Sequence, residues 1–237
     1  MLHRELKWGI LANIIGLVIN RRSGRFNDMS SNYIFVVRMD VQHDKEELFN
    51  EVYDSEHVPE LKKVKGVFNI GRYWTALRSE PKYLAIYEID NPNIRETAEW
   101  KKYVEIGRWS KEVRPYTMNR YHAIYAWVGG NPGLKWDTKY LFLAMMDVEE
   151  HKEALFNELY EAEHIPQLMS VPGVTNVTRY KTSAEGHPQY LAIYEIEQPD
   201  VPTSEAFWKE ADKGRWISEV RPFTYNKHLS VYEWIKQ

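Results

Sequence analysis

The stretch YIFVVRMDVQHDKEELFNEVYDSEHVPEL, residues 33–61, returns as YLFLAMMDVEEHKEALFNELYEAEHIPQL, residues 140–168, at an offset of 107 residues. The same offset relates three further pairs of segments: KGVFNIGRY (65–73) and PGVTNVTRY (172–180), PKYLAIYEID (81–90) and PQYLAIYEIE (188–197), GRWSKEVRPYTMN (107–119) and GRWISEVRPFTYN (214–226). Matching Trp100 with Trp208 requires a local slip of one residue. Copies of about a hundred residues indicate a repeated folding unit, because solenoid repeats are much shorter.

Each copy is predicted to contain a strand, a helix, two strands, a helix and a strand, in that order. Residues 33–41 are rich in aromatic and β-branched residues and apolar on both faces, which predicts a buried strand. Residues 45–64 place apolar side chains at helical spacing, with Asp44 as the N-cap and Pro59 as a bend or end. The remaining elements are a strand from Gly66 to Tyr73, a strand over 83–89, a helix over about 96–113 that ends before Pro115, and a strand over 121–128.

This order is the ferredoxin-like split arrangement, in which helices cover one face of the sheet. The second apolar face needs another cover, and the other copy is the obvious candidate. We therefore expect an α+β fold in which two tandem ferredoxin-like β-α-β-β-α-β units form an intramolecular, pseudo-dimeric α/β barrel. The expected division is an N-terminal extension (1–30), a first unit (31–128), a linker rich in Gly and Pro (129–138) and a second unit (139–237).

The N-terminal extension contains an apolar stretch, WGILANIIGLVI, over residues 8–19. This stretch is too short to span a bilayer comfortably, and no small-residue cleavage site follows it. Stable membrane insertion and secretion are therefore not expected. An alternative is that translation starts at Met29 and that residues 1–28 are not part of the native protein.

Composition narrows the class of protein. Of 237 residues, 43% are apolar and 27% charged, which is ordinary for a soluble globular protein, and a net charge of -3 without a basic stripe argues against a nucleic-acid partner. The absence of Cys excludes disulfides and thiolate catalysis and favours a reducing, cytoplasmic location. Nine Trp and sixteen Tyr suit either aromatic-rich core strands or a pocket for a small hydrophobic or aromatic molecule.

The segments YDSEHVPEL, followed by KGV and GRY, and YEAEHIPQL, followed by PGV and TRY, resemble the dimeric α/β-barrel superfamily and, within it, EthD-like proteins. The resemblance covers residues 31–237. It implies a pseudo-dimer within one chain, because single-unit members are typically homodimers, and it leaves further oligomerisation open. The superfamily includes cofactor-free monooxygenases, lactone isomerases, polyketide cyclases, decarboxylases, aldoxime dehydratases, haem enzymes and stress proteins, so the fold alone does not choose a function.

Each copy places a tyrosine, a glutamate and a histidine at i, i+3 and i+4 of a predicted helix: Tyr53, Glu56 and His57, then Tyr160, Glu163 and His164. Such a histidine can exchange protons, the glutamate can fix its tautomer, and the tyrosine can bind a substrate oxygen. The competing interpretation is that the histidine only caps the helix. One histidine per copy, without HxH or HxxxH spacing, does not favour a metal site.

Further candidates could bind the substrate. Arg72 and Arg179 end the second strand of each copy, and Arg114 and Arg221 precede prolines; a guanidinium there could hold a carboxylate or enolate oxygen. The alternative for the first pair is an ion pair with Glu88 or Glu195. Strand alternation places four tyrosines on one face, and with one tryptophan they complete the candidate binding set: Tyr83, Tyr87, Tyr190, Tyr194 and Trp74.

The copies differ at three informative pairs of positions: Arg38 and Met145, Trp74 and Lys181, Tyr121 and His228. Such differences suggest that one half is active and the other structural.

The leading hypothesis is a cofactor-independent enzyme of the lyase, isomerase or cyclase type. His57 or His164 would be its acid/base, acting on a small hydrophobic, aromatic or polyketide-like oxygenated molecule inside the barrel. One alternative is a non-catalytic small-molecule-binding or stress-response protein. Others are a cofactor-free monooxygenase and a haem-dependent dehydratase with a single histidine as axial ligand.

Overall fold

The computed structural model describes residues 31–235. The apolar stretch 8–19 and the alternative start at Met29 lie outside these residues. Eight strands are present: β1 (Tyr33–Val41), β2 (Val67–Trp74), β3 (Tyr83–Ile89), β4 (Thr117–Gly130), β5 (Tyr140–Val148), β6 (Val174–Lys181), β7 (Tyr190–Ile196) and β8 (Thr224–Trp234). The α-helices are α2 (Glu46–Val52), α3 (Val58–Leu61), α4 (Ala98–Tyr103), α5 (Glu153–Leu159), α6 (Ile165–Met169) and α7 (Glu205–Ala211).

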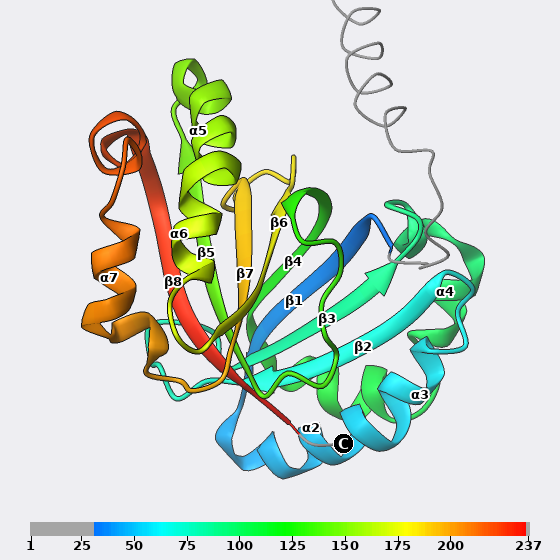
Figure 1. Ribbon diagram of the computed structural model, residues 1–237. Helices are drawn as coiled ribbons and strands as arrows, with labels where there is room; N and C mark the ends of the chain where they lie inside the picture. Colours follow the sequence, from blue (N-terminus) through cyan, green and yellow to red (C-terminus); the bar gives the residue numbers. More distant parts are fainter. Residues whose placement is uncertain (1–30, 236–237) are drawn as a thin grey trace, which may run out of the picture. The chain divides into compact units, whose positions relative to one another are not determined.

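The strands close into an antiparallel barrel in the order β1-β3-β2-β8-β5-β7-β6-β4. Each half contributes four neighbouring strands, and the halves join where β2 pairs with β8 and β4 pairs with β6. Helices α2, α3 and α4 lie outside the first half of the barrel, and α5, α6 and α7 lie outside the second (Figure 1). The expected fold of two tandem ferredoxin-like units in one barrel is confirmed.

Strand alternation separates two environments. On β3, Leu84 and Ile86 face the barrel interior, whereas Tyr83, Ala85 and Tyr87 face the helices. The interior is filled by packed side chains from both halves, which form one apolar cluster. The two cavities described below lie outside this packed interior, between the sheet and the helices, and not at the expected position inside the barrel.

The first helix differs from the single helix expected over 45–64. It runs from α2 through a π-helical turn, η2 (Tyr53–His57), into α3. The N–H of Val58 bonds the carbonyl of Tyr53, five residues back, and this wider turn accommodates Pro59 at the start of α3, since proline has no N–H to donate. Pro59 thus does not end the helix, which continues to Leu61, and Asp44 lies in a preceding 3₁₀ turn without capping the helix.

The second helix, expected over 96–113, is broken in two. After α4, the chain turns at Gly107 with φ of 78° and enters a second π-helical turn, η4 (Trp109–Val113), before Pro115. A side chain at position 107 would meet the carboxylate of Glu56, since a Cβ there would lie 2.4 Å from Oε2. Glycine is needed here both for the left-handed backbone and for this close approach.

The two copies superpose without a slip in register. Trp100 packs edge-on against Phe35 with ring centroids 5.7 Å apart, and Phe207 packs in the same way against Phe142, also at 5.7 Å. The structural equivalent of Trp100 is therefore Phe207, and the offset of 107 holds through this region. Strand β4 is longer than expected because it pairs first with β1 and then with β6, so its end at Gly130 includes residues assigned to the linker.

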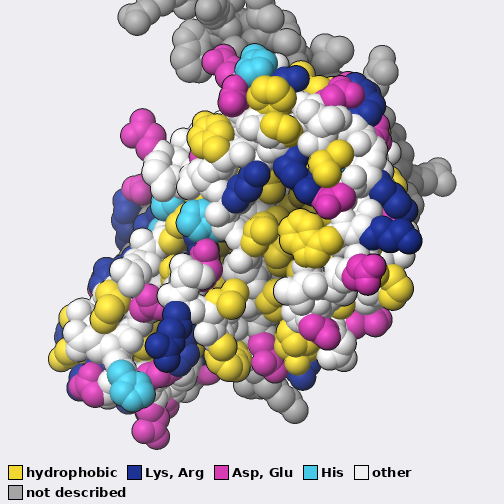
Figure 2. Space-filling view, turned by 90° about the vertical axis from the view of Figure 1, so that its left-hand side faces the viewer, with side chains coloured by type: hydrophobic (Ala, Val, Ile, Leu, Met, Phe, Trp, Pro, Cys, Tyr) yellow, Lys and Arg dark blue, Asp and Glu magenta, His cyan; other side chains and the backbone are white. Residues whose placement is uncertain are grey.

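The outer surface has no large region of one charge on the face that Figure 2 shows, where acidic and basic side chains are interspersed. Between residues 31 and 235, no helix has the length and apolar character needed to cross a bilayer.

Candidate functional site

Two cavities lie between the sheet and the helices, one in each half. The first cavity has a volume of about 490 Å³, and its sheet wall consists of Phe35, Val37, Met39, Tyr87 and His122. Its helix wall includes Tyr53, His57, Trp100, Trp109 and Arg114. The second cavity has a volume of about 180 Å³ and is lined by the equivalent elements, among them Tyr160, His164, Tyr194, Phe207, Trp216 and Arg221.

His57 is buried, with 4% of its surface exposed, and forms part of the helix wall of the first cavity. Its ring stacks on Trp109 at 4.3 Å and meets the edge of Tyr53 at 5.0 Å. Its Nδ1 has no hydrogen-bond partner among the described residues. Burial, and then the charges of Arg114 and Arg72, lower the pKa of His57 to about 3, so the ring is neutral at physiological pH.

His164 repeats this environment in the second half. It stacks on Trp216 at 4.3 Å, its Nδ1 also lacks a partner in the described part of the chain, and burial lowers its pKa to about 3. The two histidines therefore differ in the size of the cavity beside them and not in their immediate contacts.

The expected pairing of glutamate with histidine does not occur. Glu56 accepts hydrogen bonds from the backbone N–H of Arg108 at 2.8 Å and from its Nε at 2.6 Å, and these contacts lower the pKa of the carboxyl. Glu163 accepts from the backbone N–H of Arg215 at 3.0 Å. Because the π-helical turn is wider than an α-helical one, Tyr53 and His57 stay together while the glutamate is turned toward the loop after α4.

The two tyrosine pairs join the helices to the sheet. The hydroxyls of Tyr53 and Tyr87 are 2.6 Å apart, and those of Tyr160 and Tyr194 are 2.7 Å apart. Burial raises the pKa of all four hydroxyls, so they stay protonated. Each pair uses one of its two O–H groups internally, which leaves one proton to donate.

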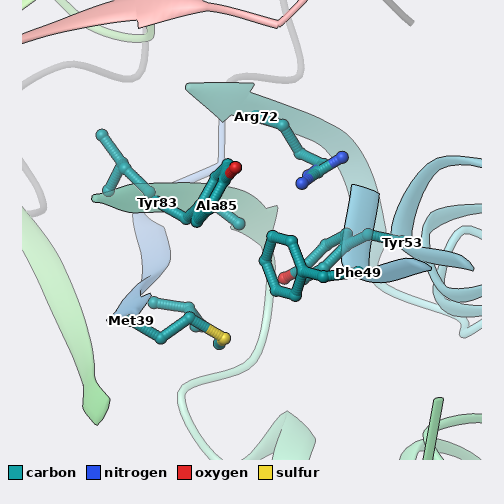
Figure 3. Close-up of a pocket in the computed structure, with 8 residues that line it drawn as sticks. Met39, Phe49, Tyr53, Arg72, Tyr83 and Ala85 are labelled. Atoms are coloured by element: carbon teal, nitrogen blue, oxygen red, sulfur yellow. The ribbon is translucent and has the colours of Figure 1, made fainter. Parts of the chain in front are cut away.

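Arg72 lies under the first helix rather than in the first cavity. Figure 3 shows its guanidinium pointing from β2 toward Phe49 and Tyr53. It forms an ion pair with Asp54 and donates to Asn50 at 2.9 Å, and the space around it has no room for a water molecule.

Arg179 makes the same contacts in the second half, with Glu161 at 2.7 Å and Asn157 at 2.8 Å. Both arginines are thus held by carboxylates one helical turn before the histidines. The alternative partners, Glu88 and Glu195, bind Asn69 and Asn176 instead.

Some of the other predicted binding residues line a cavity, and the rest do not. Tyr83 donates to Glu46 at 2.5 Å and Tyr190 donates to Glu153 at 2.6 Å, and neither lines the two cavities. Trp74 lies at the end of β2, away from both. Of the predicted binding residues, those that line the cavities are Tyr87 and Arg114 in the first and Tyr194 and Arg221 in the second.

The sequence analysis did not predict several polar residues of the first cavity: Arg95, Glu96, Lys101, Glu105, Thr117, Arg120 and His122. The Nε2 of His122 is buried without a hydrogen-bond partner in the region the structure describes, and burial, with the charges of Arg95 and Arg120, lowers its pKa to about 4. The second copy has Leu229 at the position of His122. An exchange of polar for apolar residues between the copies is the signal that would have found it.

Arg38 and His228, two residues that differ between the copies, lie close together at one end of the barrel. Glu80 joins them, bonding Arg38 at 2.6 Å and Nδ1 of His228 at 3.0 Å, and the guanidinium of Arg38 lies 4.3 Å from the ring centre of Tyr121. The second copy has His187 where the first has Glu80, so this charged cluster forms once. Within residues 31–235, no group of three acidic or histidine side chains is placed to hold a metal ion.

Comparisons with known proteins place the fold. No family profile and no curated protein matches the chain. Among solved structures, it is similar to a candidate monooxygenase from Fusobacterium nucleatum, with a TM-score of 0.62 and 11% identity over 88% of this chain and 94% of that one.

An anthrone oxidase-like protein has a TM-score of 0.61 and 10% identity over 86% of this chain and 91% of that one. A chlorite dismutase from Candidatus Nitrospira defluvii, solved with imidazole, has a TM-score of 0.56 and 9% identity over 87% and 92%. These neighbours share the dimeric α/β-barrel fold.

Proposed function

We propose that the chain is a small-molecule enzyme that transfers a proton in its first cavity, with His57 as the acceptor. The observation that carries this proposal is a buried, neutral histidine that lines a 490 Å³ cavity and whose Nδ1 has no hydrogen-bond partner among residues 31–235. Buried polar groups in proteins are normally hydrogen-bonded, so a bound molecule is the natural partner for this ring. The volume lies in the range of small-molecule pockets.

The walls favour an aromatic, oxygenated substrate. Phe35, Trp100 and Trp109 offer ring faces and edges, and the tyrosine pair can donate one hydrogen bond to a carbonyl. Arg114, held by Glu105 at 2.7 Å, brings a positive charge to the same wall. A polyketide-like aryl ketone combines these features.

The chemistry is proton transfer next to a carbonyl. A C–H proton moves to a ring nitrogen of His57, and its electron pair remains on the substrate as an enolate. The enolate oxygen is stabilised by a tyrosine hydroxyl and by the positive charge of Arg114. Because His57 has a low pKa in the free protein, it gains the proton only as negative charge forms beside it, and it returns the proton readily to another carbon or a leaving group. Lyase, isomerase and cyclase reactions all use such a step.

The test is hydrogen–deuterium exchange of 2-tetralone and anthrone, two aryl ketones with acidic C–H groups, followed by NMR in D₂O. We expect His57→Ala to slow the catalysed exchange by about 100-fold or more, the usual scale for loss of a general base. The matched variant His164→Ala should stay within about twofold of the wild type, because its cavity is small. Equal losses in both variants would contradict the assignment to the first cavity. Binding of these ketones without any exchange would support the alternative of a non-catalytic carrier or stress protein.

The low pKa of His57 also predicts an unusual pH profile. A base must be neutral to act, and His57 becomes protonated only near pH 3. We therefore expect kcat/KM for exchange to stay flat from pH 8 to pH 5, where an ordinary histidine would lose activity below about 6.5. A midpoint near 6.5 would contradict a base whose pKa is lowered by burial, and its loss or persistence in His57→Ala would show whether His57 is the group that titrates.

A second candidate is a cofactor-free monooxygenase, favoured by the neighbours named monooxygenase and anthrone oxidase-like. The same carbanion would react with dioxygen, and loss of water from the hydroperoxide would convert CH₂ to C=O. One dioxygen would be consumed and one water released per ketone. An oxygen electrode distinguishes this reaction from simple exchange.

Haem would fit the first cavity better than the second, since that cavity is larger and is lined by His57, whose Nδ1 has no partner among the described residues. A bound haem would supply redox chemistry. The proton transfer to His57 does not require haem. A Soret band in the purified protein would favour the dehydratase alternative.

We also propose that the chain arose by tandem duplication of an EthD-like unit. The segments YDSEHVPEL and YEAEHIPQL supply the π-helical turn and the buried histidine in both halves, which supports a common origin.

A further inference from the structure

We propose that the ligand of the first cavity is an aromatic carboxylate, whose acidic group is bound by Arg95 and His122. The inference deepens the proposed function by naming a substrate class for the same cavity. It does not require that His57 act as a base, because it concerns binding alone.

Phe35 is the centre of this subsite. Trp100 meets its ring edge-on at 5.7 Å and His122 does so at 5.9 Å, while the guanidinium of Arg95 lies 4.9 Å from its ring centre. All four side chains line the first cavity. An aromatic ring bound here therefore has aromatic rings, a cation and an imidazole as neighbours.

Arg95 has no carboxylate partner among the described residues. The other cations of the first cavity are engaged: Arg114 pairs with Glu105 at 2.7 Å, Lys101 pairs with Glu96 at 3.0 Å, and Arg120 donates to Thr117 at 2.6 Å. A free guanidinium offers two parallel N–H groups, which match a carboxylate better than a neutral oxygen.

His122 supplies the second contact. The buried Nε2 lacks a hydrogen-bond partner in the described part of the chain, and a buried polar group without a partner is destabilising. The charge of Arg95 contributes to the lowered pKa of His122, which places the two groups within electrostatic reach of each other. A neutral imidazole with its proton on Nε2 can donate to the carboxylate that Arg95 pairs with, so one ligand group would satisfy both side chains.

The second half lacks these features. Pro202 replaces Arg95, Leu229 replaces His122 and Phe207 replaces Trp100, and the second cavity is less than half as large. The histidine, its stacked tryptophan and the tyrosine pair are retained. The residues that differ are therefore those that would recognise a charged aromatic ligand.

The test compares two ligands with the same ring system, 2-naphthoate and the neutral 2-naphthalenemethanol, by isothermal titration calorimetry on the full chain. We expect the wild type to bind 2-naphthoate at least tenfold more tightly. Arg95→Ala should reduce this preference to within about twofold, because it weakens binding of the acid much more than binding of the neutral ligand. His122→Leu, which introduces the second half's own residue, should reduce the preference by about threefold or more.

Lys227→Ala is the matched control, because Lys227 takes the place of Arg120 in the second cavity, and its preference should equal that of the wild type. Equal affinity of the wild type for the two ligands would overturn the proposal, as would an unchanged preference in Arg95→Ala. Arg95 is exposed, so this variant is not expected to unfold. His57→Ala should keep the preference for the acid. The experiments can thus contradict the proposal of anion binding without contradicting that of proton transfer, and the reverse.

Discussion

The first and second cavities have the same framework and different walls. In both, a buried histidine stacks on a tryptophan at 4.3 Å and a hydrogen-bonded tyrosine pair links helix to sheet. Their volumes are nevertheless 490 and 180 Å³. The surroundings of the histidine are therefore a property of the repeated fold. The space available for a ligand depends instead on a few residues that differ between the two copies.

The physical cause of the difference lies in α4 and β4. Lys101 of the first half can extend into solvent, but the second half has Trp208 at that position, a bulky side chain that lines the second cavity. Leu229 likewise presents an apolar side chain where His122 offers a hydrogen-bonding ring. The second cavity is consequently smaller and more apolar.

The largest expected effect concerns the charged cluster that occurs once. Glu80→Ala leaves Arg38 buried without its partner, and loss of one partner of a buried ion pair costs about 3–5 kcal/mol. His187→Ala changes the equivalent residue of the second half and removes only a ring contact with Tyr121, so about 1 kcal/mol or less is expected. Urea unfolding of both variants measures the difference. Similar losses of stability in the two variants would mean that the charged cluster contributes no more to stability than the equivalent residues of the second half.

A smaller loss of stability is expected when the pH is lowered. His57 and His164 should contribute equally to this loss. The folded pKa of about 3 lies below the unfolded value near 6.5, so the unfolded state takes up a proton first as pH falls. Stability is thus complete above about pH 6.5 and is lost progressively toward pH 3. Between pH 7 and pH 5 each histidine should remove about 2 kcal/mol from the free energy of unfolding.

Single variants separate these contributions. His57→Leu and His164→Leu should each reduce the change in stability between pH 7 and pH 5 by that amount, whatever their stability at pH 7. Urea unfolding at the two pH values measures this change. A variant with the wild-type pH dependence would show that its histidine titrates normally in the folded state.

The smallest effect is expected from transferring the ligand-binding residues. Introducing Pro202→Arg and Leu229→His together gives the second cavity the polar pair of the first. We expect less than a tenfold gain in 2-naphthoate affinity at that site, below about 1.4 kcal/mol, because the volume is unchanged. Calorimetry of the double substitution in an Arg95→Ala background, compared with Arg95→Ala alone, measures the gain at the second cavity. A gain equal to the first cavity's affinity would show that the polar pair, and not the volume, limits binding.

Much of the fold followed from the sequence. The offset of 107 residues, the strand and helix order and the two-sided apolar strands together implied a closed barrel, because an uncovered apolar sheet face is costly in water. The position of His57 on the first helix, near Tyr53, followed from local spacing. The broken second helix did not, since its break depends on Glu56 reaching Gly107 from another element.

In the candidate site, too, some features could be predicted from the sequence and others could not. Sequence by itself determined which residue types recur in both halves and on which face of a strand they lie, because alternation and helical spacing are local properties. Only the tertiary structure decided that Arg72 of β2 is enclosed by α2 and η2, that Glu56 binds Arg108 and not His57, and that Arg95 and His122 both lie close to Phe35. Those outcomes depend on contacts between elements distant in the chain, which pattern and propensity do not encode.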